Sequence, residues 1–194
     1  MIIKEISKIV EDACKQETNY FGYGSWTHHM LPVVKYAKLM AKKIGANEEI
    51  VEIAALLHDY ASVKDYKLYE DHHIHGAKLA EEILKNLNYP PEKIEIVKQC
   101  ILSHRGSKPR QKLALEELCV ADADAMAHFD SISSLFYLAF FSHKMSIDEA
   151  DDWLAKKLER SWSKLSPEAK EIVGEKYLAS KLLIGSPSER NSDY

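Results

Sequence analysis

The sequence predicts an all-α fold, a helical bundle with extra helices at its C-terminal end. Apolar residues recur every three or four positions along almost the whole chain of 194 residues, which is the period of a helix and not the alternation of a strand. Serine, asparagine and proline, which favour helix N-termini, stand where these segments begin. The length suits one domain with a sizeable core, so we expect one helical domain over residues 1–185.

The first two helices should be joined by an irregular loop. Residues 2–14 mix apolar and charged side chains with a helical period. Residues 18–25 are rich in glycine and aromatic side chains, which is typical of a loop. The second helix then ends near Gly45, a residue type common just after a helix. Pro32 is expected to lie in the first turn of that helix or to kink it.

Three helices are expected between residues 47 and 104. Asn47 can cap the first, which should reach Asp59 or the residue after it, because the apolar run before Asp59 keeps the helical period. Residues 72–88 carry the second helix. Residues 91–104 carry the third, which is opened by a pair of prolines, since proline is favoured in a first helical turn.

The C-terminal half continues as a series of helices. One is expected over residues 113–129, and a strongly apolar stretch follows at 131–144. Ser146 and the glutamate three residues later match a capping box, which starts a helix through two tryptophans. Ser166 and the proline after it start the last helix. Residues 186–194 are polar and lack apolar periodicity, so we expect a disordered tail.

Composition narrows the class of function. The formal net charge of −4 offers no broad basic surface for a nucleic-acid polymer but allows a small anionic ligand. Cys14, Cys100 and Cys119 are widely spaced and form no C-x-x-C pair, which is typical of core thiols in a reducing compartment. No apolar run approaches a membrane-spanning length and no export signal is evident. We therefore expect a cytoplasmic protein with a small phosphorylated substrate and no membrane partner.

Histidines on buried helix faces indicate a metal site. The chain has nine histidines, and His29, His58 and His104 each share a face with apolar residues of their own helix. Asp59 directly follows His58 at the end of an apolar run, where a bare carboxylate is costly to bury without a cation. Imidazole and carboxylate ligands together suit a divalent metal and leave positions open for water and a phosphate oxygen.

The order and spacing of these residues resemble those of HD-domain phosphohydrolases. The similarity covers about residues 26–130 and leaves 131–185 as a C-terminal helical extension. The resemblance implies an HD-type helical domain. It rests on His29 with Val33 and Ala37, the run from Ala54 to Asp59, His72 with Gly76 and Ala77, Ile101 with His104, and the triplet Asp122, Ala123 and Asp124.

The resemblance implies a set of metal ligands. In that family the first histidine, the His-Asp pair and a later aspartate hold the metal, which corresponds to His29, His58, Asp59 and Asp124. Asp124 fits the family's pattern of alanine, aspartate, any residue and a large apolar residue. Asp122 lies on the more apolar face of its segment, so it stays an alternative ligand or a partner that orients one.

A second group resembles positions that serve either a second metal or the substrate phosphate. His72 and His104 match histidines with these two roles in HD enzymes. Arg105 opens a basic loop that runs to residue 112 and can donate charge-assisted hydrogen bonds to phosphate. Lys64 follows the His-Asp pair in a segment that often borders the site. Sequence alone does not separate the two roles.

The function implied by the resemblance is that of a metal-dependent phosphohydrolase, acting on a phosphate monoester or phosphoanhydride of a nucleotide-like metabolite. Water activated by the metal would attack phosphorus, Asp59 or Asp122 would accept a proton, and His104 would stabilise the phosphate charge. The ligand types favour manganese, iron, cobalt, nickel or zinc over magnesium. A non-catalytic metal- or nucleotide-binding sensor is the alternative, and a plain bundle with structural histidines is a third.

Departures from the family patterns limit the choice of substrate. The residues after Asp59 lack the Glu-Asp of guanosine-tetraphosphate hydrolases, and the chain has no Gly-Tyr-Pro motif of cyclic-dinucleotide phosphodiesterases. Many relatives have Arg-Leu-Asp where residues 125–127 are alanine, methionine and alanine. The aromatic residues between positions 136 and 162 are expected to form core or homodimer contacts and not a platform for bases.

Overall fold

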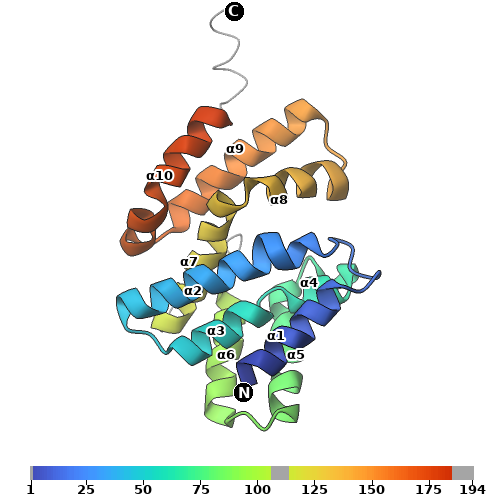
Figure 1. The fold of residues 1–194 in the computed structure, drawn as a ribbon, viewed down its shortest axis with the longest axis vertical. Coiled ribbons are helices and arrows are strands. Elements are labelled where there is room, and N and C mark those ends of the chain that lie inside the picture. The colour runs from blue at the N-terminus through green and yellow to red at the C-terminus, as the bar shows by residue number, and fades with distance from the viewer. Residues whose placement is uncertain (1, 106–113, 185–194) are drawn as a thin grey trace, which may run out of the picture.

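Helices make up every regular element in the part of the chain that the structure describes (Figure 1). This computed structural model describes residues 2–105 and 114–184. The all-α prediction is confirmed. In chain order the elements are α1 (Ile2–Cys14), the π turn η1 (Trp26–Met30), α2 (Leu31–Ile44), α3 (Glu48–Leu57), α4 (Tyr60–Lys64), the 3-10 turn η2 (Tyr66–Leu68), α5 (His72–Asn86), α6 (Pro91–Ser103), α7 (Leu115–Asp130), α8 (Ile132–Tyr137), the π turn η3 (Leu138–Ser142), α9 (Ile147–Lys164) and α10 (Pro167–Leu183).

Helix α7 joins two groups of helices. Figure 1 shows α1 and α3 to α6 on one side of α2, and α8 to α10 on the other. Helix α7 packs against α2, α3 and α6 in the first group and against α9 and α10 in the second. Its sequence suits this place, because alanines at 121, 123, 125 and 127 let neighbouring helices approach closely. Residues on every face of α7 are buried, which is typical of a helix in the interior.

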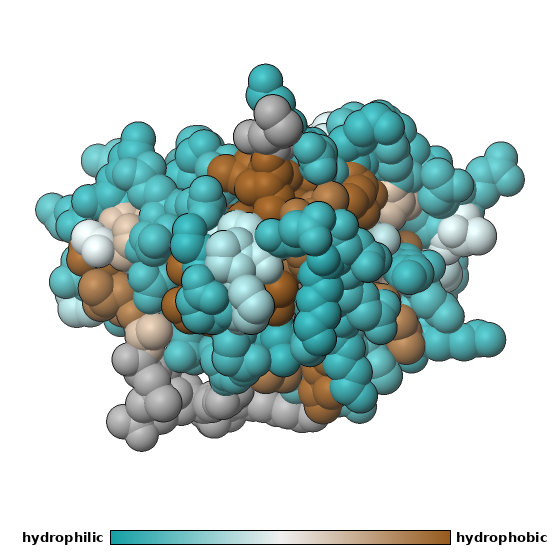
Figure 2. Space-filling view, turned by 90° about the horizontal axis from the view of Figure 1, so that it is seen from below, coloured by the Kyte–Doolittle hydropathy of each residue, from teal (hydrophilic) through white to brown (hydrophobic). Residues whose placement is uncertain are grey.

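The hydrophobic core follows α3 and α7 through the molecule. Its buried residues run from Ile6 in α1 to Ile184 after α10 and form one cluster. In α3, Ile50, Val51 and all residues from 53 to 57 are buried. Seen from below, the surface is mostly hydrophilic, with apolar areas separated by polar side chains (Figure 2). Burial of these apolar side chains is the main stabilising contribution to the fold.

The predicted helix caps are confirmed. The side chain of Asn47 accepts a hydrogen bond from the Ile50 amide at 3.1 Å. Ser146 and Glu149 form a complete capping box at the start of α9. The hydroxyl of Ser166 accepts from the Ala169 amide at 3.2 Å and caps α10. These contacts satisfy amide groups that a helix N-terminus leaves unpaired.

Several boundaries differ from the sequence-based expectation. The second helix begins with a π turn, and Pro32 lies in the first turn of α2. The helix after Asn47 ends at Leu57 and not at Asp59, because Asp59 leaves helical geometry with φ −109° and ψ 10°. The short helix α4 then begins at Tyr60, an element that the sequence pattern did not indicate.

Some expectations concern residues outside the described part of the chain. These are the disordered tail at 186–194, the basic residues from 106 to 112, and residue 113 at the expected start of α7. Between residues 2 and 105 and between 114 and 184, no helix has both the length and the apolar character to cross a membrane.

Candidate metal centre

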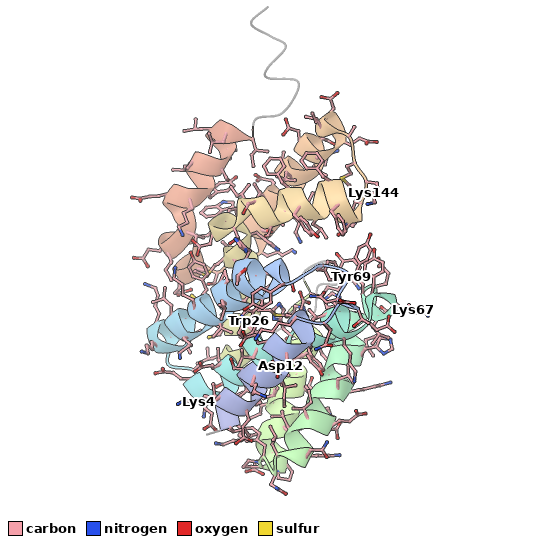
Figure 3. The ribbon with its side chains drawn as sticks, turned by 45° about the vertical axis from the view of Figure 1, so that its right-hand side comes forward. Lys4, Asp12, Trp26, Lys67, Tyr69 and Lys144 are labelled. Carbon is pink, nitrogen blue, oxygen red and sulfur yellow. The ribbon has the colours of Figure 1, made fainter. Side chains whose placement is uncertain are left out.

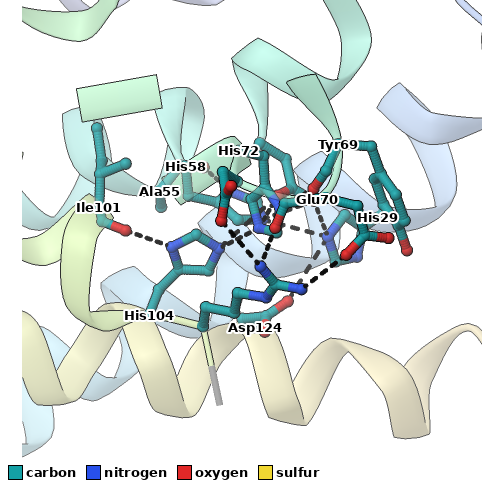
Figure 4. A network of polar contacts seen from close by, with 12 residues as sticks. His29, Ala55, His58, Tyr69, Glu70, His72, Ile101, His104 and Asp124 are labelled. Carbon is teal, nitrogen blue, oxygen red and sulfur yellow. Dashed lines mark hydrogen bonds and ion pairs between the residues drawn. The ribbon is translucent and has the colours of Figure 1, made fainter. Parts of the chain in front are cut away.

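The ends of several helices bring imidazoles and carboxylates together at one place. His29 lies in η1 just before α2, and His58 follows the last residue of α3. His72 is the first residue of α5, and His104 follows the last residue of α6. Figure 4 shows these side chains converging above α7, which contributes Asp124. Together with Asp59 they are called the His/Asp cluster below.

Backbone carbonyls set the tautomers of three of these histidines. Nδ1 of His58 donates to the Ala55 carbonyl at 2.7 Å, Nδ1 of His72 to the Tyr69 carbonyl at 2.7 Å, and Nδ1 of His104 to the Ile101 carbonyl at 2.6 Å. In each case the carbonyl lies three residues earlier in the chain. A carbonyl oxygen can only accept, so Nδ1 carries the proton and Nε2 of the neutral ring has a free lone pair.

The first group of the cluster lies around His29. Its Nε2 is 3.2 Å from Nε2 of His58 and 3.1 Å from Oδ2 of Asp59. Oδ1 of Asp124 lies 3.6 Å from the same nitrogen. The ligand atoms of His29, His58 and Asp59 lie within 4.8 Å of one another, so one ion can contact all of them.

The second group uses the other oxygen of Asp59. Oδ1 is 3.3 Å from Nε2 of His72 and 3.7 Å from Nε2 of His104. The two imidazole nitrogens are 3.2 Å apart. Asp59 therefore lies between two groups of potential ligands, one for each carboxylate oxygen.

Electrostatic contacts keep both carboxylates ionised. Burial alone would raise the pKa of Asp59, but the imidazoles of His58 and His72, and hydrogen bonds with His104 and His29, hold it well below its usual range. Burial likewise opposes ionisation of Asp124. The nearby imidazoles still lower its pKa, and His128 has the largest effect among them. Both side chains are thus available as anionic ligands at neutral pH.

The imidazoles respond to the same surroundings in different ways. Burial lowers the pKa of His58 to about 4 and also lowers the pKa of His72. Burial acts against the charged forms of His29 and His104 too, but hydrogen bonds with Asp59 raise their pKa values above the usual one. His58 and His72 are therefore neutral at pH 7, the form in which imidazole binds a metal.

The donor set fits a divalent cation. In their neutral forms His72 and His104 point two Nε2 lone pairs at each other across 3.2 Å, an arrangement that a cation or a proton between them relieves. His29 and His58 have the same Nε2 separation. Nitrogen and carboxylate oxygen donors together match borderline divalent ions such as zinc or manganese.

The structure places Asp122 away from this cluster. Its Oδ1 accepts from the Ser166 amide at 3.2 Å, and its Oδ2 accepts from the Ser166 hydroxyl at 2.5 Å. Asp122 therefore holds the N-terminus of α10. The expected roles of Asp122 as a proton acceptor or alternative ligand do not fit this position. Its carboxylate binds Ser166 on a face of α7 that points away from the His/Asp cluster.

Lys64 also lies apart from the cluster, and Arg105 lies at its edge. Lys64 is exposed, with Nζ 5.9 Å from the centre of the Tyr60 ring, and it borders a different hollow beside α1. Arg105 donates to the Glu70 carbonyl and lines the cavity above the cluster. A role for Lys64 at the site is thus contradicted by its position, whereas Arg105 can reach a ligand in the cavity.

Two side chains at the site were not expected from the sequence. His128 lies four residues after Asp124 on α7 and stacks on His29, with ring centres 6.1 Å apart. Its Nδ1 is 2.9 Å from Ser161 Oγ, and that hydroxyl donates to the Lys157 carbonyl, so Nδ1 of His128 is the donor. The spacing of four residues between Asp124 and His128 could have indicated a shared helix face. Lys157 comes from α9, outside the region of motif similarity.

The cluster lies in a cavity of about 700 Å³, within the usual range for small-molecule sites. Its walls come from the loop before α2, from α7, from α8 and from α9. Tyr69, Phe21 and Tyr137 add aromatic surface to the lining. Figure 3 shows Tyr69 between the group of helices that contains α1 and α5 and the helix α8. The space is larger than a single phosphate group needs.

The sequence of this chain is similar to those of known proteins. A family model described as HD domain matches residues 26–128. An uncharacterized protein from Clostridium beijerinckii is 39% identical over 82 residues, which are 41% of this chain and 52% of that protein. Ribonuclease Y from Petrotoga mobilis is 30% identical over 99 residues, which are 51% of this chain and 17% of the ribonuclease. The chain thus spans about half the length, or less, of these curated relatives.

Solved structures share the fold over nearly the whole chain. The crystal structure of Bacillus subtilis YpgQ in complex with ADP covers 98% of both chains with a TM-score of 0.71 and 21% identity. A predicted HD superfamily hydrolase from an uncultured Thermotogales bacterium covers 91% of both chains with a TM-score of 0.56 and 23% identity. At such identities the likeness shows the fold.

Proposed function

The chain belongs to the HD domain family, and on that basis we propose that it is a metal-dependent phosphohydrolase, acting on a phosphate ester or anhydride of a small, nucleotide-like molecule. One observation carries the proposal. Two groups of imidazole and carboxylate ligands share Asp59 within a cavity of about 700 Å³. That arrangement places a potential metal site where a small phosphorylated molecule fits.

We assign the metal ligands to His29, His58, Asp59 and Asp124, the four side chains of the first group. A divalent cation supplies two effects when bound, a lowered pKa for water and polarisation of a phosphate oxygen. The contact of Nδ1 with the Ala55 carbonyl holds the His58 imidazole in the required orientation. Asp59, ionised and in contact with both groups, is the proton acceptor that we assign to the attacking water.

His72 and His104 have two alternative roles in this proposal. With one cation per chain, His104, whose pKa is raised by its hydrogen bond with Asp59 against the effect of burial, would in its protonated form donate a hydrogen bond to the substrate phosphate. With two cations per chain, His72 and His104 would hold the second together with Asp59. The number of metal ions bound per chain separates these roles.

A nucleotide-like substrate is supported by the size of the cavity and by a structural neighbour. YpgQ, which shares the fold over nearly its whole length, has been crystallised with ADP. Aromatic side chains at the cavity wall, Phe21, Tyr69 and Tyr137, offer flat surfaces of the kind that bases contact. The identity of the base and of the phosphate group is left to measurement.

The test compares metal content and phosphate release in wild type and His58→Ala. A panel of nucleotides and simple phosphoesters is assayed with added manganese, cobalt, nickel, zinc or magnesium. His143→Ala is the matched control, because His143 is exposed and outside the cluster. We expect bound metal and turnover in wild type and His143→Ala, and loss of both in His58→Ala with unchanged circular dichroism.

Other outcomes have definite meanings. Bound metal without turnover on any compound would contradict the phosphohydrolase and favour a binding or sensor function. Absence of bound metal under every condition would contradict the metal site itself. Asp124→Asn, a change of one atom at the surface of the cavity, repeats the test with a variant that preserves packing.

A further inference from the structure

Helix α9 turns three basic side chains toward the cavity that contains the His/Asp cluster. Lys157, Arg160 and Lys164 all line it, and spacings of three and four residues place them on one face of the helix. Lys156, next to Lys157 in the chain, instead forms an ion pair with Asp152, with Nζ 2.6 Å from Oδ2. The three basic residues, called the α9 row below, therefore belong to the cavity wall.

The ammonium group of Lys157 lies in the cavity without a partner of its own. The side chain is half-buried, and within the described ranges 2–105 and 114–184 its Nζ makes no hydrogen bond or ion pair. Burial lowers the pKa of Lys157, while the carboxylates of Asp124 and Asp59 act in the opposite direction. A cation held by those carboxylates would neutralise them. The half-buried ammonium of Lys157 would then need another anion to compensate its charge.

The charged side chains of the cavity wall also indicate an anionic ligand. Among the described residues of the lining, the three basic residues of the α9 row face two carboxylates, Asp59 and Asp124, while Arg105 is paired with Glu70 and Asp71. The cavity thus has an excess of positive charge before any metal binds. Cations in a concave, partly water-excluded site attract and orient anions strongly.

The length of the α9 row indicates how many anionic groups it can contact. Lys157 and Lys164 are seven positions apart, which is about 10 Å along a helix at 1.5 Å per residue. The three cationic side chains of the row, spread over that length, offer more hydrogen-bond donors than a single phosphate group uses. A chain of linked phosphates can extend from the His/Asp cluster along the row.

We propose that the α9 row is the binding subsite for the phosphate chain of an anhydride-linked di- or triphosphate. It holds the phosphates next to the one that reacts at the His/Asp cluster. The inference rests on the proposed function for the reacting phosphate and adds the substrate class, a phosphoanhydride and not a monoester. Hydrolysis adds one water across a P–O–P link: the water oxygen bonds to phosphorus, and the bridging oxygen leaves with the other phosphate. No further reactant is needed.

Titration calorimetry of the metal-loaded protein with inorganic tripolyphosphate and with orthophosphate tests the subsite. Lys157→Gln and Arg160→Gln are compared with Lys156→Gln, the neighbouring lysine outside the cavity. We expect wild type to bind tripolyphosphate at least about tenfold more tightly than orthophosphate, and each row variant to lose about tenfold or more of that affinity. Lys156→Gln should match wild type, and Arg160→Lys, which keeps the charge, should retain most of the affinity.

The outcomes separate this inference from the proposed function. Metal content should be the same in all these variants, because no α9 residue is among the assigned ligands. If wild type hydrolyses a substrate but the row variants bind tripolyphosphate like Lys156→Gln, the subsite is contradicted and the phosphohydrolase stands. If the row variants lose affinity for tripolyphosphate while wild type shows no turnover, the subsite is supported and the phosphohydrolase is contradicted.

Discussion

Asp122 and Asp124 illustrate how two positions on one helix separate structural and chemical roles. A step of two residues rotates a side chain by about 200° around a helix axis. Asp124 consequently faces His29, with Oδ1 3.6 Å from Nε2, whereas Asp122 faces the start of α10 and accepts two hydrogen bonds from Ser166. One carboxylate belongs to the His/Asp cluster and the other to the packing of α10 on α7.

Exchanging these aspartates for asparagine should therefore affect two different properties, metal affinity at position 124 and stability at position 122. Asp124→Asn removes a charged ligand and is expected to weaken metal binding at least about tenfold, with little change in stability. Asp122→Asn should leave metal affinity unchanged and lower the free energy of unfolding by about 1–3 kcal/mol, because a buried charged acceptor is lost. Metal titration and urea denaturation of both variants measure the two effects. Equal metal loss in both variants would contradict the assignment.

Resemblance to a motif predicted most of the cluster but not its complete surroundings. His29, His58, Asp59, His72, His104 and Asp124 lie together as their order in the sequence suggested. The choice of Asp124 over Asp122 was open, because apolar periodicity favoured Asp122, which the structure places outside the cluster. Lys157 could not be predicted, since its place depends on how α9 docks against α7, and local periodicity does not encode that docking.

At the scale of elements, helix starts were more predictable than helix interruptions. Asn47, Ser146 and Ser166 cap their helices as expected, because a capping side chain acts on amides only two or three residues away. The π turns before α2 and after α8 were not indicated. They depend on tertiary packing, and no local residue preference marks them strongly.

Gly76 lets α5 approach the cluster closely. A Cβ atom at this position would lie 3.3 Å from Cγ2 of Ile101 and 3.4 Å from the carbonyl oxygen of His58. Ile101 lies in α6, three residues before His104, and His58 directly follows α3. Glycine at position 76 is thus explained by close packing as well as by its spacing from His72 in the motif.

We expect Gly76→Ala to be less stable than Gly174→Ala by about 1–3 kcal/mol. Among the described residues, a Cβ at Gly174 in α10 would meet Trp162, at 3.9 Å, which is an ordinary contact. Alanine there should gain the usual helix preference of about 1 kcal/mol. Thermal or urea unfolding of both variants gives the difference. Equal stability would mean that α5 shifts to accommodate the extra methyl group without cost.

The whole molecule is organised around one apolar cluster that includes residues from α1 to α10. Helix α7 contributes to both helical groups, so neither can separate without exposing its buried face. The ligands of the His/Asp cluster come from helices that are far apart in the sequence. Metal binding should accordingly stabilise the folded chain as a unit.

Metal should raise the midpoint of a single thermal transition. At a free metal concentration of about 100 times Kd the expected gain is about 2.7 kcal/mol, which corresponds to about 5–10 °C for a chain of this size. Tryptophan fluorescence and far-ultraviolet circular dichroism should report the same midpoint, and a chelator should reverse the shift. His58→Ala should show no shift, and two separate midpoints would contradict a single cooperative unit.

Helix α9 lies beyond the segment that defines the family, since the match ends at residue 128 and α9 spans Ile147–Lys164. Nevertheless α9 forms one wall of the cavity. Under the proposed function, substitutions in this wall would change which anions bind and would leave the His/Asp cluster as it is. Chains that are similar over the matched segment would then differ in substrate through their α9 side chains.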